Sequence, residues 1–202
     1  VEQRTLLTAV VLLIGGELQV LADTSESITV RENPTQPGRL DVQINGTAAA
    51  NLPDVATDQI SSIKIVAGAG DNIVDVSGVT LAAFGNLNSL TVDGADGNDT
   101  ISASADIATN VSGGDGADSI TGGSGGDTIN GGDGNDSITA GTGNDSINSG
   151  HGDDFVSGND GDDVITGDDG QDTVMGGLGN DSILGGDGAD SLSGEDGNDT
   201  VN

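Results

Sequence analysis

Hydrophobic residues recur at every ninth position through the second half of the chain. Residues 113–202 divide into ten nine-residue units without an insertion, and the seventh and ninth positions of these units are mostly Ser, Thr or Asn. The eighth position is always aliphatic: Ile120, Ile129, Ile138, Ile147, Val156, Ile165, Val174, Ile183, Leu192 and Val201. Polar and apolar residues that alternate are typical of a β-strand with one buried face. Each unit therefore predicts a three-residue strand whose middle side chain points inward.

The first six positions of each unit predict a turn. Gly occupies the fourth position and Asp the sixth in all ten units, and Gly is frequent at the first and second. Glycine allows a positive φ and leaves main-chain carbonyl groups open to a ligand. The exceptions are Ala140 and Ser149 at the first position and Asn159, Asp168 and Glu195 at the second, where we expect slight strain without loss of a ligand.

Weaker copies of the unit lie upstream. Residues 94–102 form an eleventh copy, and residues 103–112 keep Val111 at the aliphatic position but have Thr109 where Asp is expected. Fainter copies are 67–75, with Gly70, Asn72 and Val74 in place, and 21–29, with Glu26 and Ile28 in place. The stretches 38–44, 61–67 and 88–92 alternate as strands do, and Pro34, Pro37 and Pro53 fall between strands.

These patterns divide the chain into two parts. Residues 1–93 are predicted to be a divergent, β-rich part of a solenoid, and residues 94–202 its regular part, with the boundary near residue 93. The apolar stretch 5–14 is too short to span a membrane and predicts a buried β-strand, which would cap the first coil or be donated to a neighbour. A remnant of a secretion signal is the alternative.

The charge of the chain points to cations as partners. The chain has 34 acidic and four basic residues, which gives a formal net charge of −30, and Gly accounts for 36 of the 202 residues. Such a charge repels nucleic acids and anionic membrane surfaces. Composition of this kind is typical of disordered tails, but the strict period of nine argues against that here.

The nonapeptide resembles GGxGxDxUx, the calcium-binding repeat of the repeats-in-toxin (RTX) family, in which U is aliphatic. The resemblance covers 94–202 strongly and the rest weakly. It implies an all-β fold, a right-handed parallel β-roll or β-helix solenoid in which two units close one coil and unit n stacks on unit n+2. It also implies that Ca²⁺ lies between stacked turns, bound by carboxylates of the sixth position and by main-chain carbonyl groups.

Carried over residue by residue, the resemblance gives a set of ligands. The carboxylates are Asp99, Asp118, Asp127, Asp136, Asp145, Asp154, Asp163, Asp172, Asp181, Asp190 and Asp199. The carbonyl groups are those of Gly113, Asp115, Gly122, Gly131, Asp133, Gly158, Gly167, Asp169, Gly176, Gly185 and Asp187. The third-position side chains of Asp115, Asp133, Asp169 and Asp187 either add a ligand or only add charge. We expect roughly eight or nine ions.

Calcium is expected to replace a large core as the source of stability. The array 113–202 carries 20 acidic residues and no Lys or Arg, and it offers one aliphatic side chain per nine residues to the interior. Eight divalent ions would supply about +16 charges, which nearly matches the acidic excess. The prediction is that 113–202 is unfolded without Ca²⁺ and forms the β-roll with it.

Two functions are consistent with these sequence features. The first is an extracellular or cell-surface structural protein of bacteria that assembles head to tail into filaments or a matrix, because the array runs to Asn202 without a capping segment. The second is a calcium-dependent folding and secretion module of a larger RTX adhesin, toxin or secreted hydrolase. No membrane span is expected. No enzymatic activity is expected either, because the chain lacks Cys, has His151 as its sole histidine and contains no catalytic motif.

Overall fold

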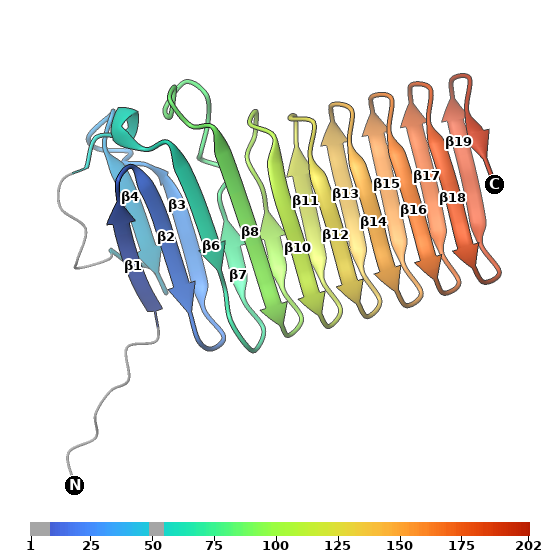
Figure 1. The fold of residues 1–202 in the computed structure, drawn as a ribbon, viewed down its shortest axis with the longest axis horizontal. Coiled ribbons are helices and arrows are strands. Elements are labelled where there is room, and N and C mark those ends of the chain that lie inside the picture. The colour runs from blue at the N-terminus through green and yellow to red at the C-terminus, as the bar shows by residue number, and fades with distance from the viewer. Residues whose placement is uncertain (1–8, 49–54) are drawn as a thin grey trace, which may run out of the picture.

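The computed structural model describes residues 9–48 and 55–202, and the chain there is almost entirely β-strand (Figure 1). A single turn of 3₁₀ helix, η1 (Thr57–Gln59), is the helical element of this described part, and no helix in it is long and apolar enough to cross a membrane. The strands are β1 (Ala9–Ile14), β2 (Glu17–Ala22), β3 (Ser27–Glu32), β4 (Leu40–Ile44), β5 (Thr47–Ala48), β6 (Ser62–Val66), β7 (Ile73–Asp75), β8 (Ser89–Asp96), β9 (Thr100–Ser102), β10 (Thr109–Asp115), β11 (Ser119–Gly123), β12 (Thr128–Asp133), β13 (Ser137–Thr142), β14 (Ser146–His151), β15 (Phe155–Asp160), β16 (Val164–Asp169), β17 (Thr173–Leu178), β18 (Ser182–Asp187), β19 (Ser191–Asp196) and β20 (Thr200–Val201).

The strands form two sheets of ten strands each, which face one another along the length of the molecule (Figure 1). One sheet, called sheet A here, has the order β1-β2-β6-β8-β10-β12-β14-β16-β18-β20, and the other, sheet B, has the order β19-β17-β15-β13-β11-β9-β7-β3-β4-β5. From β8 onward the chain alternates between the sheets, and neighbouring strands of a sheet are parallel. The predicted all-β solenoid is confirmed.

Successive coils stack with a register of two nonapeptides. Ser119 pairs with Ser137, Ile120 with Ile138 and Thr121 with Thr139, so unit n lies on unit n+2 as predicted. The predicted division into a six-residue turn and a three-residue strand is wrong, because most strands of the array contain six residues, from the seventh position of one unit to the third position of the next. The first three positions of a unit therefore lie in the sheet, and the chain reverses over the fourth to sixth positions.

The interior is a double row of aliphatic side chains. In sheet B, Ile120, Ile138, Val156 and Val174 lie in register and are at most 1% exposed, and the equivalent row of sheet A faces them. The eighth position therefore points inward, as predicted. In the last coil this burial is lost, since the side chain of Val201 is 43% exposed.

The weak upstream copies join the same rows. Ile28 pairs with Val74, which pairs with Ile101, and Val92 of β8 pairs with Val111 of β10. The predicted strands at 38–44, 61–67 and 88–92 are present as β4, β6 and β8. Pro53 lies outside the described residues. The sheets thus continue across residue 93 without a break.

Antiparallel hairpins close the N-terminal end of the solenoid. β1 pairs with β2 at the end of sheet A, and the run β3-β4-β5 ends sheet B. The predicted strand at 5–14 is present over 9–14, and residues 5–8 lie outside the described part. The expectation that it is buried is wrong. Val11 points to the core, whereas Val10, Leu12 and Ile14 are 42%, 39% and 64% exposed, because an end strand of a single sheet has only one face on the core.

Candidate metal centres

The sixth-position aspartates form two columns, one along each edge of the solenoid. The main-chain N–H of Asp118 donates to Oδ1 of Asp136 at 2.8 Å, and the N–H of Asp136 donates to Oδ1 of Asp154 at 2.8 Å. The same bond recurs along the opposite edge, from Asp127 to Asp145 and from Asp145 to Asp163. Every sixth-position Asp predicted to stack on another does so. These pairs are Asp99/Asp118, Asp118/Asp136, Asp136/Asp154, Asp154/Asp172, Asp172/Asp190, Asp127/Asp145, Asp145/Asp163, Asp163/Asp181 and Asp181/Asp199.

The second oxygen of each carboxylate has no hydrogen-bond donor. Oδ2 is buried and without a hydrogen-bond partner in Asp99, Asp118, Asp127, Asp136, Asp145, Asp154, Asp163, Asp172 and Asp181. Buried polar atoms are nearly always paired, since an unpaired one costs on the order of 1–3 kcal/mol and more when it is charged. A column of such atoms favours a bound cation.

A carbonyl oxygen from the next coil lies near the orphaned atom in the turns that begin with glycine. A methyl group placed on Gly113 would lie 2.2 Å from Oδ2 of Asp118 and 2.5 Å from the carbonyl oxygen of Gly131. The same construction on Gly167 gives 2.4 Å to Oδ2 of Asp172 and 2.3 Å to the carbonyl oxygen of Gly185. Two acceptors therefore approach one point beside the first-position glycines up to Gly176, and this point lies between stacked turns.

Burial makes the charged form of these aspartates costly in the metal-free chain. Burial, together with repulsion from neighbouring Asp136 and Asp99, raises the pKa of Asp118 to about 7, although the hydrogen bond from the Asp99 N–H acts in the opposite direction. Burial also raises the pKa of Asp127, Asp136 and Asp163 to about 6. A cation bound beside Oδ2 would offset both the desolvation and the repulsion between stacked carboxylates.

The donor set fits Ca²⁺. That ion takes six to eight oxygen ligands in a flexible geometry and accepts carboxylates and main-chain carbonyl groups together. No three acidic or histidine side chains meet at one point in the described residues. Each turn instead offers carboxylate oxygens and carbonyl oxygens of glycine-rich backbone. With Ca²⁺ in place, the ion would supply the positive charge that this arrangement of acceptors lacks.

The predicted carbonyl ligands fall into two groups. Those at the first position include Gly113, Gly131, Gly176 and Gly185, whose oxygens approach the orphaned Oδ2 atoms of Asp99, Asp118, Asp163 and Asp172. The carbonyl groups at the third position lie elsewhere. Those of Asp115, Asp133, Asp169 and Asp187 each accept the main-chain N–H of a fourth-position glycine in the preceding coil.

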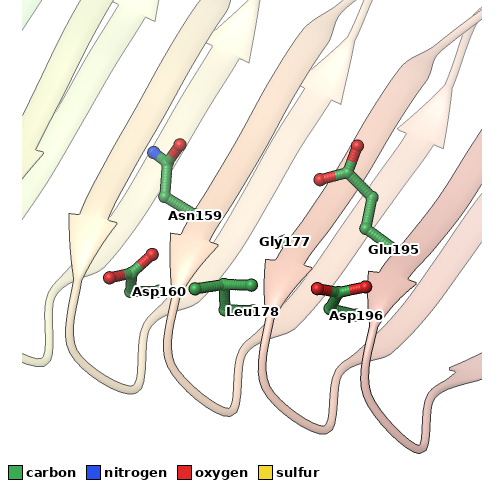
Figure 2. Close-up of a pocket in the computed structure, with 6 residues that line it drawn as sticks. All are labelled: Asn159, Asp160, Gly177, Leu178, Glu195 and Asp196. Atoms are coloured by element: carbon green, nitrogen blue, oxygen red, sulfur yellow. The ribbon is translucent and has the colours of Figure 1, made fainter.

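The third-position side chains point away from the turns. The side chains of Asp115, Asp133, Asp169 and Asp187 are exposed, and Asp169 lies 3.0 Å from Nδ1 of His151. Figure 2 shows the same outward arrangement for Asp160, Leu178 and Asp196, which border a shallow depression on the outer face of sheet B. The third-position aspartates therefore add charge to the surface.

The non-glycine residues at the second position adopt a strained backbone. Asn159, Asp168 and Glu195 have φ values of 72°, 78° and 67°. This left-handed region is uncommon for residues with a Cβ atom. The expected strain is therefore present, and the side chains of Asn159 and Glu195 project outward on either side of Gly177 (Figure 2).

The run of aspartates on one edge is followed by Asn72, and the stacked turns continue beyond it to buried Glu26. The N–H of Asn72 donates to Oδ1 of Asp99, and the Asn72 Oδ1 accepts the N–H of Glu26, so Asn72 occupies the place of an aspartate. Its side-chain Nδ2 donates to the carbonyl groups of Gly68 and Gly70 in its own turn. An amide group here provides the donors that a carboxylate lacks.

The fifth-position side chains also form hydrogen bonds between coils, which the sequence analysis did not predict. Fifth-position Asn and Asp side chains accept a main-chain N–H from the next coil, as Asn144 does from Asp162 and Asp162 does from Asn180. The signal was the recurrent Asn-Asp pair at the fifth and sixth positions. These side chains are exposed, so they tie neighbouring turns together on the outside.

The comparisons with known proteins agree with this geometry. A search of curated proteins finds no match to the chain. The family model for the RTX calcium-binding nonapeptide repeat, which spans four copies, matches residues 91–107, 112–147, 130–165, 148–183 and 166–201, together more than half of the chain. The chain therefore belongs to the family of proteins with RTX calcium-binding nonapeptide repeats.

Proposed function

We propose that this chain is an extracellular, calcium-binding structural protein of bacteria whose solenoid is folded by Ca²⁺ and which assembles end to end into filaments or a matrix. The column of buried Oδ2 atoms without donors carries the calcium part of this proposal. Roughly nine ions, one for each such atom, and the sixth-position aspartates as their ligands belong to it. Extracellular calcium is abundant enough for weak sites of this kind to be filled.

The N-terminal hairpin supports assembly. The side chains of Val10, Leu12 and Ile14 are exposed on the outer face of β1, and exposed Leu21 on β2 pairs with Val10. β1 is the end strand of sheet A among the described residues, and end strands recruit further strands. A head-to-tail contact would place this hairpin on the far end of a second copy, and a contact of this type repeats without closing.

Electron microscopy of the purified chain with Ca²⁺ and after chelation with EGTA tests this function. We expect filaments in Ca²⁺ that disperse on chelation. The variant Ile14→Lys should abolish filaments and leave calcium binding unchanged, whereas Val164→Lys, at another exposed position in the middle of the array, should keep the filaments.

Single particles in Ca²⁺ would favour the second candidate, a calcium-dependent folding and secretion module of a larger RTX adhesin, toxin or hydrolase. The observation that favours it is the same column of carboxylates, because repulsion between them keeps the array unfolded where calcium is scarce. A β-rich spectrum of 113–202 that is unchanged without calcium would contradict both candidates.

A further inference from the structure

The first-position glycines of the array are not required by the backbone. Positive φ values in the array occur at the second and fourth positions, as at Gly132 and Gly134, and at none of the first-position glycines. The strand pairing also passes over the first position. Thr121 pairs with Thr139 and Gly123 with Gly141, while 122 and 140 are left out of the register. Another property must account for glycine at this position.

That property is space beside the orphaned carboxylate. A methyl group on Gly158 would lie 2.2 Å from Oδ2 of Asp163 and 2.6 Å from the carbonyl oxygen of Gly176, which is far inside van der Waals contact. A Cβ atom at the first position therefore pushes apart the two oxygens that approach each other between stacked turns. Only hydrogen leaves both oxygens in place.

Two consecutive units lack this glycine. Ala140 and Ser149 stand at the first position, and both are 0% exposed, so the methyl and hydroxymethyl groups lie inside the turns. The hydroxyl of Ser149 donates to the carbonyl oxygen of Gly167 at 2.8 Å. This bond gives that carbonyl group a donor inside the protein. Oδ2 of Asp145 in the other of these two turns stays buried without a partner.

We propose that the residue at the first position sets the calcium affinity of each turn, and that the turns of Asp145 and Asp154 bind Ca²⁺ more weakly than the other seven. The inference rests on the proposed calcium-binding function and goes beyond it. It also differs from the sequence-based expectation that Ala140 and Ser149 would strain the turn without affecting a ligand. In the turn of Asp145 a methyl group separates the oxygens that would share the ion. In the turn of Asp154 a hydroxyl group already satisfies one of them.

The two weak turns belong to a single coil. Residues 140–157 make one full circuit of the solenoid, with Asp145 on one edge and Asp154 on the other. The coils before and after it have glycine at the first position on both edges, at Gly122, Gly131, Gly158 and Gly167. The array is therefore divided by one calcium-poor coil into two calcium-rich blocks, and this coil is where exchange of main-chain amides begins when calcium falls.

The test is a count of bound calcium on the full chain by equilibrium dialysis over a range of free Ca²⁺. We expect two classes of site in the natural chain, seven tighter and two weaker, with dissociation constants at least about tenfold apart. Ala140→Gly and Ser149→Gly should each move one site into the tighter class, and the double variant should show one class. Ala117→Gly, the same change at an exposed fifth position, is the control and should leave both classes unchanged.

The reverse change provides a second arm. Gly158→Ala should move the site of Asp163 out of the tighter class. Nine equivalent sites in the natural chain would overturn this inference while leaving the proposed function intact. A weaker rather than tighter site in Ser149→Gly would also overturn it, because the hydroxyl would then be a ligand. Absence of calcium binding in the natural chain would instead overturn the proposed function.

Discussion

At the scale of the residue, each sixth-position aspartate uses its two oxygens differently. Oδ1 accepts a main-chain N–H from the preceding coil at 2.7–3.1 Å, and Oδ2, which has no hydrogen-bond donor in nine of these residues, is the proposed ligand of a cation. Asn72 shows what an amide does at the same place, since its Nδ2 donates to carbonyl oxygens of its own turn. The comparison separates two roles of the side chain. Asn72 performs the role in stacking, but it has no second oxygen to offer a cation, because its Oδ1 accepts the N–H of Glu26 and its other terminal atom is the donor Nδ2.

Replacing one aspartate of the array by Asn tests this separation. In Asp163→Asn, Oδ1 can still accept the N–H of Asp145, and the new amide group can donate to the carbonyl oxygen of Gly176. We expect the chain to bind one Ca²⁺ fewer and to lose about 2.7 kcal/mol of stability when free Ca²⁺ is 100 times the dissociation constant. Without calcium its stability should not fall. Calcium counting and thermal unfolding measure both effects.

The matched control for this variant is Asp160→Asn. It removes the same charge from an exposed third position of the same unit. Its calcium count should be unchanged. Equal losses of calcium in the two variants would mean that overall charge, not the turn, holds the ions.

Protonation of the buried aspartates should partly stabilise the fold when calcium is absent. Burial raises the pKa of Asp118 to about 7 and of Asp127, Asp136 and Asp163 to about 6, against about 3.9 in an unfolded chain. Between these values the folded chain binds more protons than the unfolded one, so the metal-free fold gains stability as the pH falls from about 7 to about 4. In calcium-free buffer without chelator, circular dichroism should show β-structure that increases over this range. A spectrum typical of an unfolded chain at every pH down to 4 would contradict the prediction that protonation stabilises the fold.

At the scale of the element, each strand of the array contributes one large aliphatic side chain to the interior, and removing it should lower the free energy of unfolding. Ile138 lies between Ile120 and Val156 in sheet B and is fully buried. Ile138→Ala leaves a cavity that neighbouring coils cannot close, and we expect a loss of about 3 kcal/mol in the calcium-bound chain. Val164→Ala, at an exposed seventh position, should stay within about 0.5 kcal/mol. Denaturant unfolding in excess Ca²⁺ compares the two, and similar losses would contradict the inward assignment of the eighth position.

The sequence predicted the features that depend on periodicity. A side chain that recurs every nine residues has one environment, so the inward eighth position followed from counting, whereas the stacking of the aspartates followed from the resemblance to the RTX repeat. The lengths of the strands did not follow, because Gly and Asp at the first three positions have low β-propensity, and pairing with the adjacent coils overrides it. The exposed face of β1 was missed because an apolar run does not reveal whether both faces are covered. The approach of Oδ2 to a carbonyl group of the next coil depends on three-dimensional packing that spacing alone does not give.

At the scale of the whole molecule, the two parts of the solenoid are stabilised in different ways. The described residues up to 93 bury 18 hydrophobic side chains, among them Phe84, and contain an ion pair of 3.1 Å between Arg31 and Asp41. The array from residue 113 buries nine, has no Lys or Arg, and aligns its carboxylates in columns. Asn72 lies near the junction and completes its turn with its own amide donors.

Removal of calcium should therefore unfold the two parts separately. In the metal-free chain we expect main-chain amides of β2, β6 and β8 to stay protected from hydrogen exchange, because these strands pair around Leu18, Ile63 and Leu90 without cations. Amides of β12 to β18 should exchange rapidly, because carboxylates without counter-ions repel one another across every pair of coils. Hydrogen exchange of the full chain, followed by peptide mass spectrometry with and without Ca²⁺, measures this directly. Asn72→Asp should extend the loss of protection into β7, because it replaces the amide donors of that turn with a charge and brings the column of carboxylates one coil further towards the hairpins. Uniform loss of protection from β2 to β18 in the natural chain would show instead that calcium stabilises the entire solenoid as one cooperative unit.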